Sequence, residues 1–317
     1  MIGTDKSGPA ILAIGGAHID RRGVASGPYI AGASNPGTMR EEVGGGAFNA
    51  LRNAVRLGAR GSMLSVRGGD LAGLMVEAAI VGAGIADLSA TFLDRTTPSY
   101  TAILDKNGEL VCGFADMALY DSAFQKQLRR HPFRDALPGS DGVLTDANLP
   151  AAALERLAAG IGSLPLFAIG ISPTKIVRLM SVLPALTVLF MNRNEARALV
   201  ERCVEIDDAT LAGALADKGL RRAVITAGGR SLLLVENGKV VRLAPPSVDF
   251  VRDVTGAGDA LAGTTMLRML QGMDLPEAVR HGIAAASLTI QSENVVADFD
   301  ETALAKRLVD VPEISGA

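Results

Sequence analysis

Residues 253–259, with the sequence DVTGAGD, combine small residues with a carboxylate directly before a helical apolar pattern. Small side chains at Gly256, Ala257 and Gly258 let backbone N–H groups approach a ligand, and the start of a helix adds partial positive charge. Asp259 falls in the first turn of that helix, within reach of a hydroxyl that attacks a bound phosphate. The segment therefore predicts an anion site with a general base. The residues alone also allow Asp259 merely to complement the helix dipole.

A second glycine-rich stretch, EEVGGGAFNALRNAVRLG, covers residues 41–58. Asn49 and Asn53 lie four residues apart, so a helix would carry both on one face. Two amides beside a glycine loop could bind a polyol. In isolation the pair is more typical of a solvated helix surface.

Two polar residues follow the first apolar run, ILAIGG. Asp20 lies near the carboxyl end of that predicted strand, where α/β sheets bind ligands, although an exposed turn carboxylate is the alternative. For His18 a structural role and a ligand role are equally compatible with the sequence. Only three histidines are present, which disfavours a histidine metal cluster.

Two further elements would suit a nucleotide site but are weak by themselves. MNRNEA carries Asn192 and Glu195, and ITAGG carries Thr226 and Gly228 after a predicted strand. Surface helices and strand ends commonly contain such residues.

The elements around these residues alternate short apolar runs with helical periods, which is typical of βαβ units and a parallel sheet. We predict a doubly wound α/β fold with a mostly parallel central sheet. The helices expected within it span 47–57, 71–81, 150–159, 173–183, 257–272 and 276–290.

Two stretches break this alternation, at about 21–39 and 97–117. The second has two alternating runs around a turn at 106–108. Both read as antiparallel strands inserted into one domain that spans 1–317. Because such strands bury one face, they suit a small lid or a clasp that pairs two copies in a homodimer.

Composition narrows the class of partner. The net charge of −3 arises from interspersed charges without a long basic run, so nucleic acid is not an expected partner. Cys112 and Cys203 are the only cysteines, which indicates a reducing compartment. No signal peptide or bilayer-length apolar run is visible, so we expect a soluble, cytoplasmic protein without a membrane partner.

Two common nucleotide motifs are missing from the sequence. The only Gly-Lys pair, Gly238 and Lys239, precedes Val240 in a predicted hairpin, and GAGIAD at 82–87 lacks the last glycine of a dinucleotide fingerprint. These observations argue against P-loop kinases and classical dehydrogenases.

The string DVTGAGDALAG resembles the C-terminal signature of the ribokinase-like (PfkB) carbohydrate kinases, and residues 41–58 resemble the N-terminal one. The resemblance implies that Asp259 deprotonates the acceptor hydroxymethyl group. It also implies that the amides of 256–258 stabilise charge on the transferred phosphoryl. Asp253 and Thr255 match positions that help bind a monovalent cation, such as K⁺, in many members.

On the acceptor side, the same resemblance gives Asp20 hydrogen bonds from sugar hydroxyls. It places the Gly45 backbone and Asn49 against the sugar. His18 stands where relatives usually carry Asn, so it is a candidate substrate contact whose detail differs.

On the nucleotide side, the resemblance implies roles for the two weak elements. Asn192 and Glu195 would organise Mg²⁺ and the ATP phosphates, often through water. Thr226 and Gly228 would contact the phosphates.

Three stretches, at 33–37, 99–121 and 171–175, resemble the pseudouridine kinase branch of this family. Phe48 and Arg52 depart from that branch, which favours Arg and Glu there. We expect transfer of the ATP γ-phosphoryl to the 5′-hydroxyl of pseudouridine or a similar ribosyl compound. The alternatives are a ribokinase-like or fructokinase-like kinase of free sugars, and a non-catalytic sugar or nucleoside sensor.

Overall fold

A computed structural model describes residues 8–201 and 206–313, and within them one large sheet organises the chain. Its strands lie in the order β15-β14-β13-β12-β11-β10-β1-β4-β6. All pairs from β13 to β6 are parallel, whereas β13–β14 and β14–β15 are antiparallel. The strands are β1 (Ala10–Ile14), β4 (Arg60–Leu64), β6 (Ala86–Asp87), β10 (Gly142–Asp146), β11 (Leu166–Ile169), β12 (Val188–Asn192), β13 (Arg222–Thr226), β14 (Leu232–Glu236) and β15 (Lys239–Leu243).

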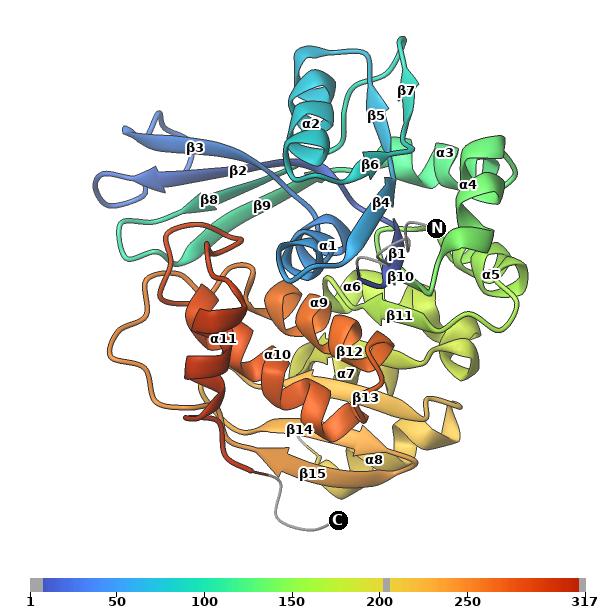
Figure 1. The fold of residues 1–317 in the computed structure, drawn as a ribbon. Coiled ribbons are helices and arrows are strands. Elements are labelled where there is room, and N and C mark those ends of the chain that lie inside the picture. Colours follow the sequence, from blue (N-terminus) through green and yellow to red (C-terminus); the bar gives the residue numbers. More distant parts are fainter. Residues whose placement is uncertain (1–7, 202–205, 314–317) are drawn as a thin grey trace.

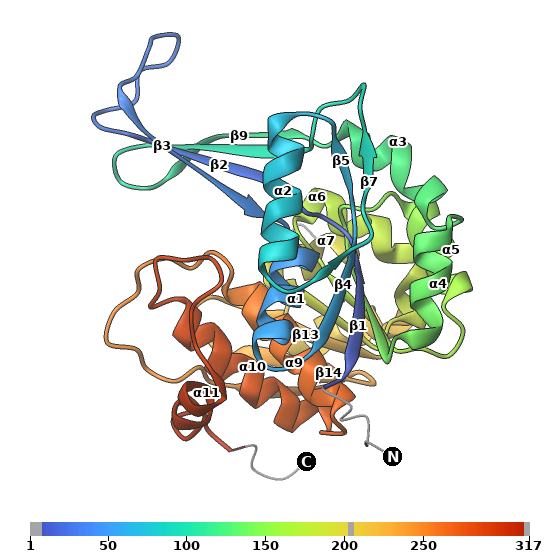
Figure 2. The same cartoon turned by 45° about the horizontal axis from the view of Figure 1, so that its top comes forward.

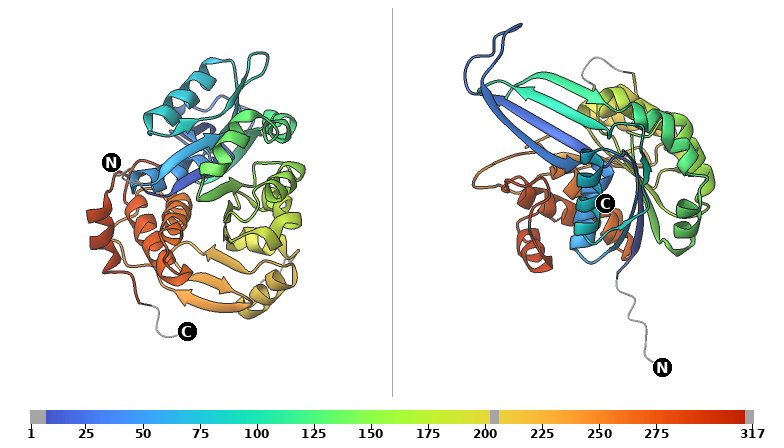
Figure 3. Two further views of the ribbon diagram at one scale, coloured as in Figure 1. Left: turned by 45° about the vertical axis from the view of Figure 1, so that its right-hand side comes forward. Right: turned by 90° about the horizontal axis from the view of Figure 1, so that it is seen from above.

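Helices cover both faces of this sheet, as Figures 1 and 3 show. The central strands are mostly apolar and are buried along their whole length, as parallel strands between helix layers require. One buried cluster joins the sheet to α1 (Gly46–Arg56), α2 (Leu71–Gly82), α9 (Ala257–Leu270), α10 (Leu275–Thr289) and α11 (Glu301–Leu308). The other joins it to α3 (Ala118–Gln127), α4 (His131–Ala136), α5 (Ala151–Gly160), α6 (Pro173–Ile176), α7 (Arg193–Leu199) and α8 (Asp208–Asp217).

This arrangement confirms the doubly wound α/β fold, with one local correction. The predicted helix at 173–183 is wrong, because α-helix ends at Ile176 and a 3₁₀ segment spans Val177–Ala185. Pro184 lies inside that segment and has no N–H to donate to an α-helical ladder.

A second, four-stranded sheet forms the predicted lid and projects from one side of the molecule (Figures 1 and 2). Its order is β3-β2-β8-β9, with antiparallel pairs β2–β3 and β8–β9 joined by the parallel pair β2–β8. The strands are β2 (His18–Ala25), β3 (Gly37–Gly44), β8 (Ser99–Leu104) and β9 (Leu110–Asp116). A short parallel pair, β5 (Val66–Gly68) and β7 (Ala90–Phe92), lies nearby.

The first lid hairpin is displaced from its expected bounds at 21–39. Pairing starts at His18, which lies opposite Gly44, and residues 26–36 form the connection between the strands. Consequently His18 and Asp20 belong to the lid itself rather than to a turn after β1.

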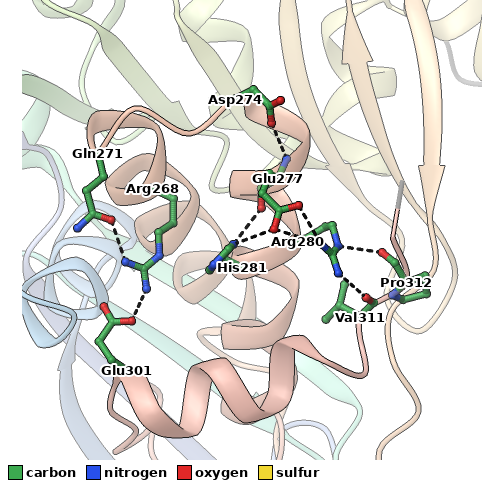
Figure 4. A network of polar contacts seen from close by, with 9 residues as sticks. All are labelled: Arg268, Gln271, Asp274, Glu277, Arg280, His281, Glu301, Val311 and Pro312. Atoms are coloured by element: carbon green, nitrogen blue, oxygen red, sulfur yellow. Dashed lines mark hydrogen bonds and ion pairs between the residues drawn. The ribbon is translucent and has the colours of Figure 1, made fainter. Parts of the chain in front are cut away.

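A polar network fastens the C-terminal helix to its neighbours (Figure 4). Arg268 of α9 is buried and contacts Glu301 at the start of α11. Arg280 of α10 donates to the carbonyls of Val311 and Pro312, which follow α11, both at 3.0 Å. These bonds hold α11 against α9 and α10.

Close contact between α1 and α9 determines where their polar residues meet. A Cβ atom at Gly263 of α9 would lie 2.0 Å from the carbonyl oxygen of Ala50 in α1, so this position has no room for a side chain. Asn49 and Asp259 therefore face each other across a tightly packed pair of helices.

We predict that Gly263→Ala destabilises the protein by roughly 1–3 kcal/mol, because the added methyl overpacks the helix pair. Gly213→Ala in α8 is the matched control, since a Cβ there meets no atom within 4 Å. It should be neutral or stabilise by roughly 0.5–1 kcal/mol. Denaturant unfolding measures both changes in free energy, and equal values would contradict the packing argument.

Candidate active site

A cavity of about 570 Å³ lies at the carboxyl ends of the central strands, which is where open α/β sheets bind ligands. The lid supplies part of one wall through Tyr100 and Ala115, and Met117, which caps α3 directly after β9, lies beside them. Ten of the predicted site residues line this cavity: His18, Asp20, Gly45, Asn49, Asn192, Glu195, Thr226, Thr255, Gly258 and Asp259.

Asp259 lies in the first turn of α9, as predicted, and its Oδ2 accepts a bond from Asn49 Nδ2 at 3.1 Å. Burial raises the pKa of Asp259 to about 7, and the nearby carboxylates of Asp146 and Asp20 add to the rise. The Asn49 bond opposes it by favouring the charged form. A carboxylate that titrates near neutrality is a capable general base at physiological pH.

The loop before α9 ends in a conformation that suits glycine. Gly256 is the N-cap residue with φ of 80°, and a Cβ there would lie 2.0 Å from the carbonyl oxygen of Val295. At Gly258 a Cβ would meet no atom within 4 Å, so the helix start opens onto free space. The free N–H groups of a helix N-terminus in such a position can receive an anion.

A second cavity of about 570 Å³ meets the first at this helix start. Thr226, Gly258 and Leu261 line both cavities. Gly228 and Ala257 line only the second, whose walls are largely apolar and include Pro245, Pro246, Val251, Ile283 and Ala286. An elongated ligand with an apolar ring and an anionic chain fits this shape, with its anionic end at 256–258.

Asn192 and Glu195 form a reciprocal capping box at the start of α7. The Asn192 side chain accepts from the Glu195 amide at 2.9 Å, and Glu195 Oε2 accepts from the Asn192 amide at 2.8 Å. Burial raises the pKa of Glu195 despite these bonds. Each carboxylate oxygen keeps a free lone pair, which could accept a metal-bound water.

On the lid side of the cavity, polar contacts of His18 link the lid to the core. His18 is buried, with Nδ1 3.1 Å from the hydroxyl of Tyr120 and Nε2 3.3 Å from Asp20 Oδ1. Burial raises the pKa of Tyr120, so it stays a neutral phenol. The contact with His18 holds the Asp20 carboxylate beside the cavity.

Glycines shape the chain around these residues. A Cβ at Gly44 would lie 2.0 Å from Asp20 Oδ2, and a Cβ at Gly45 would lie 2.2 Å from the carbonyl oxygen of Gly16. Gly45 also has φ of 116°, which a residue with a side chain rarely adopts.

Asp146 is a residue that the sequence argument missed. It ends β10, fully buried, and its Oδ2 accepts from the amides of Gly16 at 2.9 Å and Ala47 at 3.0 Å. Its Oδ1 accepts from the amide of Asn148 at 2.9 Å. One carboxylate thus fixes the chain before His18 and the start of the helix that carries Asn49. The only signal in the sequence is an aspartate that ends an apolar strand.

Asp253 lies outside the lining of the main cavity, although Thr255 belongs to it. Its Oδ1 accepts from the Thr255 amide at 2.9 Å and hydroxyl at 2.7 Å, while Oδ2 contacts Arg22 of the lid. Burial would raise the pKa of Asp253, but the bonds from Thr255 and Arg22 outweigh it and hold the pKa below its usual range. A guanidinium is therefore the positive charge found at this carboxylate.

Asn53 lies apart from the site, so its suggested pairing with Asn49 around a polyol is wrong. It is fully buried, and its Nδ2 donates to the carbonyl of Asn49 at 2.9 Å within α1. Phe48 is also buried in the core, with the Arg52 guanidinium 5.2 Å from its ring centre. Neither Phe48 nor Arg52 lines the main cavity.

Several kinds of site are missing from the part of the chain that the structure describes. Within residues 8–201 and 206–313, no three His, Cys, Asp or Glu side chains are arranged to hold a metal ion. No helix in these ranges has both the length and the apolar character needed to cross a bilayer. Cys112 is a free, exposed thiol of the lid, and Cys203 lies outside the described residues.

Comparison with known proteins gives consistent matches along the chain. The model of the pfkB family carbohydrate kinases matches residues 9–302. Pseudouridine kinase from Escherichia coli is 26% identical over 89% of this chain and 91% of its own length. Pseudouridine kinase from Arabidopsis thaliana is 24% identical over 90% of this chain and 92% of its own length.

Solved structures match equally broadly. A carbohydrate kinase from Agrobacterium tumefaciens is 42% identical, with a TM-score of 0.83 over 96% of this chain and 98% of that one. Arabidopsis thaliana ribokinase, solved with ribose and ATP, has a TM-score of 0.83 over 95% and 99% of the two chains. At 19% identity, the second likeness concerns the fold alone.

The raised pKa of Asp259 predicts a stability change with a definite pH dependence. Between the ordinary pKa of aspartate and about 7, the folded state binds a proton that the unfolded state has lost. The wild type therefore loses stability as pH rises through this window. At pH 8, Asp259→Asn should be more stable than the wild type, on the order of a few kcal/mol.

Denaturant unfolding from pH 4 to 8 measures this difference. The advantage of Asp259→Asn should shrink as pH falls below about 7. Asp135→Asn, at an exposed position of α4, is the control and should show no such trend. An advantage that stays constant with pH would refute the raised pKa.

Proposed function

The chain belongs to the pfkB family of carbohydrate kinases, and on that premise we propose that this phosphotransferase transfers the γ-phosphoryl of ATP to the 5′-hydroxyl of pseudouridine. The observation that carries the transfer step is Asp259, a carboxylate of raised pKa at the helix start where two cavities meet. The choice of acceptor is supported by the two pseudouridine kinases that match about nine-tenths of the chain.

In the proposed reaction Asp259 accepts the proton of the acceptor hydroxyl. The freed oxygen attacks the γ-phosphorus in line with the bond to the β-phosphate, which breaks as ADP leaves. The products are a phosphate monoester, ADP and one proton, which Asp259 later returns to water. Asn49 keeps the carboxylate directed at the cavity through its 3.1 Å bond.

Charge on the transferred phosphoryl group would be stabilised by the amides of 256–258 at the start of α9. Thr226 and Gly228 border the same region and are suited to contact the phosphates. The apolar walls of the second cavity suit the adenine ring of ATP.

Asn192 and Glu195 are the residues that fit a magnesium ion, through water. Mg²⁺ commonly keeps several waters and binds substrate phosphates rather than an all-protein cage, which agrees with a buried carboxylate that retains free lone pairs. The ion would neutralise phosphate charge. A K⁺ ion at Asp253 and Thr255 stays a proposal, and Arg22 would compete with it for the carboxylate.

The lid would complete the site when acceptor is bound. His18 and Asp20 lie on β2, and the same strand reaches Asp253 through Arg22, so the lid contacts both the acceptor side and the loop before the anion site. Contact of the lid with the acceptor would exclude water from the phosphoryl group.

The lid also supports a proposed homodimer. Its strands expose large apolar side chains, among them Met39, Leu110 and Phe114, each more than half exposed. An uncovered apolar sheet of this kind would be buried by a second copy.

Light scattering should show that the wild type is a dimer and that Phe114→Glu is a monomer. A monomeric wild type would refute the proposal.

A free-sugar kinase is the alternative acceptor class, and a sugar or nucleoside sensor is the alternative without catalysis. A sensor has no use for a carboxylate of raised pKa aimed at a hydroxyl beside an anion site, so Asp259 disfavours it. The three possibilities differ in what they do to ATP.

ADP release in the presence of Mg²⁺ and a panel of nucleosides and free sugars separates these possibilities. We predict the largest acceleration with pseudouridine. Asp259→Asn should keep its fold and its ATP binding and lose about 10²- to 10⁴-fold in kcat, the usual contribution of a positioned base. ADP release that no acceptor accelerates would favour the sensor. ADP release that is fastest with a free sugar would refute the nucleoside acceptor.

A further inference from the structure

The main cavity extends across the sheet edge to a second set of polar residues that the proposed reaction does not use. Asp259 and Asn49 reach the cavity from α9 and α1 on one face of the sheet. Asn148 and Lys175 reach it from the segments after β10 and β11, whose neighbours pack on the other face. The far part of an acceptor whose hydroxyl lies at Asp259 would meet Asn148 and Lys175.

The Asn148 amide has a defined orientation. Lys175 Nζ can only donate, and it lies 2.6 Å from Asn148 Oδ1, so the oxygen faces the lysine and Nδ2 is the free donor. The backbone of Asn148 is fixed as well, because its amide donates to Asp146 and its carbonyl accepts from Arg178 at 3.0 Å. The donor is therefore held in place.

That donor is unusual because it is buried and unused. Asn148 is 2% exposed, and Nδ2 has no hydrogen-bond partner among the described residues. A Cβ at Gly16 would lie 2.7 Å from Nδ2 and 3.2 Å from the ring of His18, so the space beside the amide depends on the glycine. Buried donors are normally paired, and an unpaired one beside a binding cavity points to a ligand.

Lys175 adds further donors at the same place. Its ammonium is half-buried and bonds to Asn148, with no carboxylate of the described residues within ion-pair distance. Burial lowers the pKa of Lys175, although Asp146 and Asp121 favour its charged form. The ammonium can donate three bonds, and only the one to Asn148 is made by its described neighbours.

The turn that carries Lys175 is strained. Ile171 has φ of 78°, a conformation that β-branched residues rarely adopt, and it lines the cavity. Ser172 then caps α6 by accepting from the Lys175 amide at 3.3 Å. Such strain persists where the surrounding structure imposes it, often at binding sites.

We propose that Asn148 Nδ2 and Lys175 Nζ bind a carbonyl oxygen of the base of a nucleoside acceptor, in particular a pyrimidine-2,4-dione. This inference rests on the proposed function and specifies its substrate class. Sugar hydroxyls can donate to Asp20 and Asp259, whereas two donors at one place suit best a carbonyl oxygen, which accepts and has no proton of its own. A free sugar leaves both donors without a carbonyl, and an amino group in place of the carbonyl would oppose them.

Calorimetric titration tests this with pseudouridine and ribose, in the presence of a non-hydrolysable ATP analogue and Mg²⁺. Asn148→Asp keeps the side-chain shape and the bond to Lys175 but removes the donor. Lys175→Met removes the charge. Each should weaken pseudouridine binding about 10- to 100-fold relative to ribose binding, the effect expected when a hydrogen bond to a charged or buried group is lost.

Lys126→Met is the matched control, because Lys126 is exposed in α3 and remote from the cavity lining. It should leave the affinity ratio of the two ligands unchanged. Circular dichroism verifies that each variant is folded, and either of the two site variants suffices for the test.

The inference would be overturned by equal losses for both ligands, which indicate a structural role, or by unchanged pseudouridine binding. A wild type that binds ribose but no nucleoside would also overturn it. Failure of the proposed function is separate, because pseudouridine binding that depends on Asn148, without phosphoryl transfer to pseudouridine, would refute only the proposed reaction.

Discussion

The contact between Asn49 and Asp259 is the interaction on which the site depends. It joins α1 to α9 at a point where the helices pack so closely that Gly263 has no room for a side chain. Burial at this point raises the pKa of Asp259, while the bond from the Asn49 amide favours its charged form. In water the carboxylate would be a weak base, and the fold raises its pKa toward neutral pH.

The start of α9 is also the place where the two cavities of the proposed reaction meet. Thr226 and Gly258 border both cavities, so the proposed anion site lies between the apolar cavity proposed for the nucleotide and the polar cavity proposed for the acceptor. On the acceptor side, the buried Asp146 carboxylate fixes the segments that lead to His18 and Asn49. The lid adds Asp20 from a different sheet. A ligand must therefore span elements from the whole length of the chain.

Much of the fold, and the place of Asp259 in the first turn of a helix, could be predicted from the sequence, because local patterns encode them. Apolar runs between helical periods predicted the parallel sheet, and the small residues before Asp259 predicted a helix that starts at an anion site. Asp146 could not be found in this way, since its partners Gly16 and Ala47 lie 130 and 99 residues away. The free donor of Asn148 also depends on a distant residue, Lys175. Asn53 was misread because helical spacing does not reveal that this side of the helix is buried.

The central claim is that Asp259 acts as a base whose pKa the fold has raised to about 7. The pH dependence of kcat/KM for the acceptor, measured at saturating Mg²⁺ and ATP, tests it most directly. Because only the ionised carboxylate accepts the proton, kcat/KM should fall about tenfold per pH unit below about 7. A plateau that extends down to pH 5 would contradict the claim, since it would mean that the carboxylate keeps its ordinary pKa or is not the base.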